Sequence, residues 1–154
     1  MLKLITDRAE ADVLRWKELK SKGYASMTDD ERREWEDSKG AYNYTDLNRV
    51  EEAVVFLSQQ LVEMGYVTEQ LVTRVWNEND VPTVADMTRY IQNVKTIRDA
   101  LSVPSTTPDV PASMHKLTFQ GANDIERILL DVEKLIENMA FTFAYSGEIY
   151  GGEL

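Results

Sequence analysis

The sequence predicts a mainly α-helical protein: a helical bundle of three principal helices with a short helical N-terminal arm and an extended C-terminal tail. Apolar residues recur at steps of three and four over three long segments, as in helices that bury one face. Residues that cap helices precede these segments, and glycine or proline follows them. With 154 residues, 43% of them hydrophobic, the chain is long enough for one domain with its own core.

The N-terminal arm is expected over residues 1–40, and its first helix begins close to the N-terminus. Asp7 and Glu10 have the spacing of a capping pair, which predicts a helix that runs to about Ser21. Gly23 then supplies the stop that glycine commonly provides at helix ends.

A second, short and charged helix is expected between Thr28 and about Ser38. Thr28 and Glu31 again have capping-box spacing. Because so polar and short a helix is marginal alone, its Trp35 is expected to pack against Trp16 and the main body.

The bundle is expected over residues 41–146, and its first helix has the most regular pattern. Thr45 is a candidate N-cap, and Asp46 lies in the first turn, where a negative charge suits the helix dipole. The stripe that follows, ended by Gly65, is interpreted as buried core. It consists of Leu47, Val50, Val54, Leu57, Leu61 and Met64.

Residues 66–82 are β-prone but have no second strand signal nearby, so an irregular or extended connection is predicted. Thr83 then caps the second bundle helix, with Asp86 at capping-box spacing, and Pro104 ends it. Its apolar stripe consists of Met87, Tyr90, Ile91, Val94, Ile97 and Leu101. The segment 103–113 contains three prolines and is expected to be a rigid linker.

The third and longest bundle helix is expected after Thr118, its N-cap. Its apolar face is broad, which places this helix at the centre of the bundle. The face consists of Ile125, Ile128, Leu129, Val132, Leu135, Ile136, Met139 and Phe143. Residues 147–154 contain three glycines and are expected to form the extended tail.

The composition excludes several classes of function. Seventeen Lys and Arg stand against 27 Asp and Glu, a net charge of −10, which argues against a nucleic-acid or anionic-membrane binder. The chain has no cysteine, which excludes thiolate catalysis. It has one histidine, His115, which excludes most zinc sites and catalytic triads. The apolar N-terminal stretch is too short for a secretory signal, so synthesis in a cytoplasm is expected.

Acidic residues cluster at 29–31, 51–52, 124–126 and 131–133. They are expected to be solvated or to cap helices, because an exposed charge is the common state. His115 is expected at the surface or near a helix cap. No catalytic, cofactor-binding or metal-binding residue and no cofactor is therefore predicted, and the protein is not expected to be an enzyme.

Aromatic and apolar residues gather near the C-terminus, where a solvated tail would not favour them. Phe143, Tyr145, Ile149 and Tyr150 are predicted to bind a partner protein. Residues 118–154 hold two basic and seven acidic side chains, so a partner that offers Lys or Arg is favoured. The three tryptophans and seven tyrosines also leave a carbohydrate-binding receptor module as an alternative.

Three stretches carry a family resemblance: LITDRAEADV, then KGAYNYTDLNRVEEAVVFL, then ANDIERILLDVEKLI with YSGEIYGGE. Together they resemble a family of small proteins encoded in the tail and baseplate gene modules of phages and prophages of Gram-positive bacteria. The resemblance implies a virion setting, other virion proteins as partners in an oligomeric assembly, and no catalytic residues. The expected function is a non-catalytic structural protein of the phage tail or baseplate, made in the host cytoplasm. A tail assembly accessory that is absent from the mature particle is the alternative.

Overall fold

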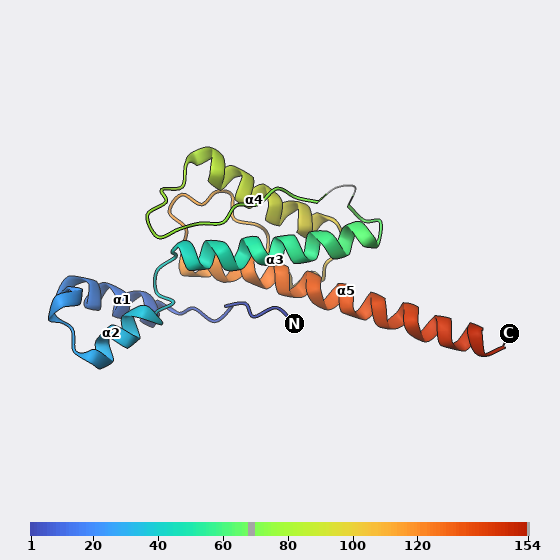
Figure 1. Ribbon diagram of the computed structural model, residues 1–154, viewed down its shortest axis with the longest axis horizontal. Helices are drawn as coiled ribbons and strands as arrows, with labels where there is room; N and C mark the ends of the chain where they lie inside the picture. Colours follow the sequence, from blue (N-terminus) through green and yellow to red (C-terminus); the bar gives the residue numbers. More distant parts are fainter. Residues whose placement is uncertain (68–69, 154) are drawn as a thin grey trace.

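The computed structural model describes the backbone of residues 1–67 and 70–153 and the side chains of these residues up to 140 (Figure 1). Within them it has five α-helices, one short 3-10 helix and no strand, which confirms the predicted mainly α fold. The elements are α1 (Glu10–Lys22), η1 (Tyr24–Ser26), α2 (Asp29–Glu36), α3 (Tyr44–Glu63), α4 (Val84–Asp99) and α5 (Phe119–Glu153).

The helices α3, α4 and α5 pack against one another as the predicted three-helix bundle (Figure 1). The seam of α3 lies in the core: Val50, Val54, Leu57 and Leu61 are at most 1% exposed. The helix α4 buries half of its predicted stripe, and α5 buries most of the described part of its own. These buried residues are Tyr90, Val94 and Ile97 of α4, and Ile125, Ile128, Leu129, Val132 and Ile136 of α5.

Capping explains where several helices start. The boxes predicted at Thr28 and Thr83 are both formed, with Glu31 and Asp86 as their partners. The hydroxyl of Thr118 likewise accepts a hydrogen bond from the first turn of α5, from the amide of Gly121 at 3.0 Å.

Two predicted caps are wrong by a few residues. The helix α1 begins at Glu10 rather than after Asp7, because the Asp12 carboxylate accepts from the Ala9 amide at 2.8 Å. The helix α3 is capped by Asn43 rather than Thr45: the Asn43 side chain accepts from the Thr45 amide at 2.9 Å. An Asn is at least as good an N-cap as a Thr.

Residues 1–9, the N-terminal strap, precede α1 without helical structure and lie along α5. The Leu2 amide donates to Glu133 at 2.8 Å. The Ile5 amide donates to Glu126 at 3.1 Å, and the Arg8 amide to Asn123 at 3.0 Å. The first part of the predicted arm therefore belongs to the bundle surface, and α1 and α2 project from it as a hairpin (Figure 1).

The hairpin of α1 and α2 is closed by its own aromatic residues. The rings of Trp16 and Trp35 stack with their centres 5.5 Å apart, as expected from the sequence. The chain returns to the bundle through Gly40, where a Cβ atom would lie 2.1 Å from the Asp12 carbonyl oxygen. Only glycine fits at this approach.

The connection after α3 is irregular in its described part, as predicted. Trp76 anchors it in the core and is 2% exposed. The Asn48 side chain donates to the Trp76 carbonyl at 2.8 Å and accepts from the Trp76 amide at 2.7 Å. A side-chain amide thus satisfies both main-chain groups, as a neighbouring strand would.

The proline-containing segment 103–113 is fixed to the bundle rather than spanning a gap between helices. Thr107 is 4% exposed, and its hydroxyl donates to Asp131 of α5 at 2.6 Å. The Arg98 guanidinium donates to the Pro108 carbonyl at 2.8 Å. These contacts hold the segment against both α4 and α5.

The extended tail predicted over residues 147–154 is wrong, because α5 continues as a helix to Glu153. Each glycine costs a helix interior about 1 kcal/mol relative to alanine, which is too little to force a stop. The last part of α5 extends past the ends of α3 and α4 (Figure 1).

Candidate binding groove and buried charge cluster

Four charged side chains meet where the strap, α3 and α5 come together. They are Arg8, Asp46, Arg49 and Glu126, and we call them the charge cluster. The Arg8 guanidinium lies 2.7 Å from Glu126 and 3.0 Å from Asp46. Arg49 lies 2.5 Å from each of the same two carboxylates. Two cations and two anions therefore balance in a site where the Glu126 side chain is 0% exposed.

The Glu126 carboxylate has its accepting positions occupied. One oxygen accepts from the Ile5 amide and Arg49 Nε, and the other from Arg8 and Arg49 Nη2. A carboxylate offers about four such positions. Burial opposes the charge of Arg49, but its hydrogen bonds to Glu126 and Asp46 raise its pKa above the usual value. The arrangement holds three segments of chain together and leaves no free oxygen on Glu126 for a reactant.

Beside the cluster, the hydroxyl groups of Tyr42 and Tyr90 are hydrogen-bonded to each other. The Arg8 guanidinium lies 5.6 Å from the centre of the Tyr42 ring, in cation–π range. Burial raises the pKa of both tyrosines, because the phenolate would lose its water.

The prediction that the acidic clusters are solvated or cap helices is wrong for three carboxylates. Glu51, Glu126 and Glu133 are 3%, 0% and 3% exposed. Glu51 pairs with Arg89 at 2.5 Å and accepts from the Trp76 indole at 3.3 Å. The acidic residues at 29–31 behave as predicted, exposed or capping α2.

One sequence signal for this burial existed. Glu126 and Glu133 are seven residues apart, which places them on one side of α5, beside its apolar stripe. Their partners come from the strap and from α3, far away in the sequence, so spacing within α5 alone could not identify them.

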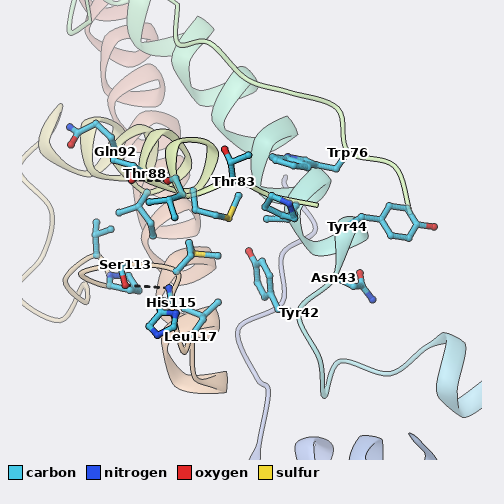
Figure 2. Close-up of a pocket in the computed structure, with 18 of the residues that line it drawn as sticks. Tyr42, Asn43, Tyr44, Trp76, Thr83, Thr88, Gln92, Ser113, His115 and Leu117 are labelled. Carbon is cyan, nitrogen blue, oxygen red and sulfur yellow. Dashed lines mark hydrogen bonds between the residues drawn. The ribbon is translucent and has the colours of Figure 1, made fainter. Parts of the chain in front are cut away.

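A groove of about 1100 Å³ opens beside the cluster, between α4, the start of α3, and the segments before α4 and α5. In the view of Figure 2, Tyr42 lies between Trp76 on one side and His115 and Leu117 on the other. The main apolar residues that line the groove are Tyr42, Leu47, Trp76, Pro82, Val84, Met87, Ile91, Val110, Pro111, Met114 and Leu117.

No pattern in the sequence predicts this groove. Met87 and Ile91 were assigned to the core stripe of α4, but both are only partly buried and line the groove. Met114 and Leu117 line it from the segment just before α5. Only the fold brings these residues together.

The charges along the groove are few. Glu78 is exposed and has no ion pair or hydrogen bond to the described residues. Asp80 pairs with Arg74 at 3.4 Å. Lys95, a cation of the lining, is already paired with Asp99 at 2.5 Å. His115 is exposed, as expected, and its amide donates to Ser113 at 3.2 Å (Figure 2).

The groove does not bring carboxylates to opposite walls. Glu78 and Asp80 come from the same short loop, and the lining contributed by α4 and residues 110–117 contains no acidic side chain. Among the described residues, no group of three His, Asp or Glu side chains could hold a metal ion.

The side chains of the predicted partner-binding residues Phe143, Tyr145, Ile149 and Tyr150 lie outside the described part of the structure. Their backbone is helical and belongs to α5. The prediction that these residues bind a partner stays a prediction.

No helix in the described part of the chain has the length and apolar character needed to cross a membrane. No protein-family model, curated protein or solved structure matches the chain.

Proposed function

We propose that this chain is a non-catalytic structural protein of a phage tail or baseplate, which joins other virion proteins through helical faces and its terminal segments. The proposal starts from the resemblance of the three sequence stretches described above. It implies that the chain is made in the host cytoplasm and becomes part of an oligomeric assembly in the virion.

The observation that carries the proposal is the elongated shape of the molecule. The hairpin of α1 and α2 projects at one end of the bundle, and the last part of α5 extends at the other (Figure 1). Two extensions at opposite ends offer two separate contact regions. A protein that connects two neighbours needs this arrangement.

The buried charges support a bracing role. The carboxylate of Glu126 accepts hydrogen bonds from Arg8, Arg49 and the Ile5 amide. The general acid or base of an enzyme instead needs to reach a reacting group in a cleft. The cluster therefore supports a rigid adaptor better than an enzyme that would use Glu126 as its acid or base.

The proposed contact at the α5 end involves Phe143, Tyr145, Ile149 and Tyr150. Aromatic residues are typical anchors of interfaces. Residues 137–154 hold three acidic and no basic side chains, which favours a basic surface on the partner.

Mass spectrometry of gradient-purified particles from a phage or prophage that encodes this chain tests the proposal. We expect its peptides at a constant ratio to the other tail proteins, whereas a host cytoplasmic protein followed as a control is depleted on purification. If the chain is absent from particles but tails fail to form without it, the protein is an assembly accessory, and the proposal is wrong.

A further inference from the structure

The groove between α4 and residues 110–117 has a composition that points to one kind of ligand. We propose that it binds a polypeptide segment of a partner protein that presents a bulky apolar side chain next to a Lys or Arg. This inference rests on the proposed function, because it specifies the chemistry of a partner that the virion adaptor would hold.

The floor of the groove favours an apolar side chain. Met87 and Ile91 of α4, and Met114 and Leu117 before α5, pack against the core yet remain only partly buried. Ligand pockets of about 300–1,000 Å³ bury most of a bound group, so a volume of about 1100 Å³ can receive more than one side chain. Methionine side chains adapt their shape to what they cover.

The loop at one end of the groove favours a cation. Glu78 is exposed and unpaired among the described residues. Asp80 accepts from the Asn77 amide at 2.8 Å, and its one ion pair is a long 3.4 Å contact with Arg74. Because Lys95 is neutralised by Asp99, the unpaired charge at the groove is negative. A Lys or Arg of the ligand would complement it, and an acidic ligand would be repelled.

The same charges disfavour a second copy of this chain as the occupant. The chain has a net charge of −10, of which residues 41–154 contribute −9. Two such surfaces repel at low ionic strength. A basic partner protein is the complementary choice.

Of the three Tyr and Trp residues that line the groove, only Tyr44, at 37% exposed, is open to solvent, so they do not form a stacked platform for a sugar ring. Trp76 is 2% exposed, and the Arg74 guanidinium lies 4.1 Å from the centre of its ring. The hydroxyl of Tyr42 is hydrogen-bonded to that of Tyr90. Carbohydrate is therefore the weaker ligand class.

The walls are held in place without a ligand. The Asn48 side chain fixes Trp76, and the capping box of Thr83 and Asp86 fixes the start of α4. Preformed walls lower the ordering cost of binding, so short peptides can serve as probes.

The experiment selects a displayed library of random short peptides on the folded full-length chain. Enriched peptides are synthesised, and their Kd is measured by fluorescence anisotropy at low and high salt. We expect enriched peptides to carry a bulky apolar residue beside Lys or Arg. Glu78→Lys and Met87→Ala should each weaken binding about tenfold, and salt should weaken it as well.

Glu52→Lys is the matched control, since Glu52 is exposed on α3 and does not line the groove. It makes the same charge change and should leave the Kd unchanged, and thermal melting verifies that each variant is folded. The inference is wrong if no peptide is enriched, if enriched peptides are acidic, or if Glu78→Lys binds like the unmodified chain. It is also wrong if the chain self-associates and Met87→Ala abolishes that self-association, because the occupant is then a second copy. Displacement of the peptide by an oligosaccharide would likewise contradict it.

The two proposals fail separately. Peptides that bind the groove of a protein absent from particles leave the groove inference standing and remove the virion role. If the protein is present in particles but its groove selects no peptide, the virion role stands and the groove inference is wrong.

Discussion

The hydroxyl groups of Tyr42 and Tyr90 share a hydrogen bond beside the charge cluster. Burial is the main reason that the pKa of each lies above the usual value of 10.0, and the nearby Glu126 carboxylate adds to it. Because the pKa is raised in the folded state, the neutral pair contributes stability that is fully present below pH 10. That stability is lost as the pH rises through the higher folded-state values.

An alkaline titration tests this pair. Phenolate formation is measured by ultraviolet absorbance. We expect two of the seven tyrosines to ionise only at the pH where the helical circular dichroism signal is lost. In Tyr90→Phe, one late-ionising group should disappear. Ionisation of all seven tyrosines while the chain remains fully helical would show that the pair is accessible to water.

At the scale of elements, one carboxylate joins three segments that are far apart in sequence. Glu126 of α5 accepts from the strap through Arg8 and the Ile5 amide, and from α3 through Arg49. Arg8 and Glu126 are 118 positions apart. The strap is therefore fixed to the bundle by charge-assisted hydrogen bonds, together with Leu2 and Leu4, which pack against the core.

We predict that Glu126→Gln lowers the free energy of unfolding by about 3–5 kcal/mol, because it leaves Arg8 and Arg49 buried beside a neutral group. Urea titration followed by circular dichroism measures the change. Glu137→Gln, an exposed position on the same helix, is the control and should change stability by no more than about 0.5 kcal/mol. Equal effects of the two substitutions would show that the cluster does not brace the fold.

The helices also show which features of the fold can be predicted from the sequence. The seam of α3, the described part of the α5 stripe and the box at Thr83 depend on neighbours along the chain, and these predictions are confirmed in the main. The α4 stripe is confirmed only for Tyr90, Val94 and Ile97. Local rules placed a helix start at Asp7 and a helix stop at Gly147. They were wrong because α5 side chains hold the strap, and because isolated glycines only weaken a helix.

The candidate site was harder to predict than the fold. Each groove residue has an ordinary local role: Met87 belongs to a helical stripe, Pro111 to a proline-containing segment, and Glu78 to a loop. The groove exists because Arg98 and Asp131 hold segment 103–113 against the bundle. These contacts join residues whose pairing leaves no periodic signal in the sequence.

At the scale of the whole molecule, the acidic charge and the elongated shape support the same proposal. The bundle lies between two extensions (Figure 1), and residues 41–154 hold eight basic and 17 acidic side chains. Electrostatic attraction to a basic neighbour would speed its encounter and would weaken as salt is added.

Deleting residues 147–154 is the sharpest test of the proposal that the α5 end binds another virion protein, because the described core of α5 ends at Ile136. The measurement is incorporation into purified tails, with thermal stability recorded in parallel. A full-length variant with Val72→Ser and Val75→Ser, at positions 74% and 79% exposed, is the control for loss of apolar surface elsewhere. We expect the deletion to leave the melting temperature nearly unchanged and to prevent incorporation, while the control is incorporated. A deletion variant that melts early and yet is incorporated normally would contradict the proposal.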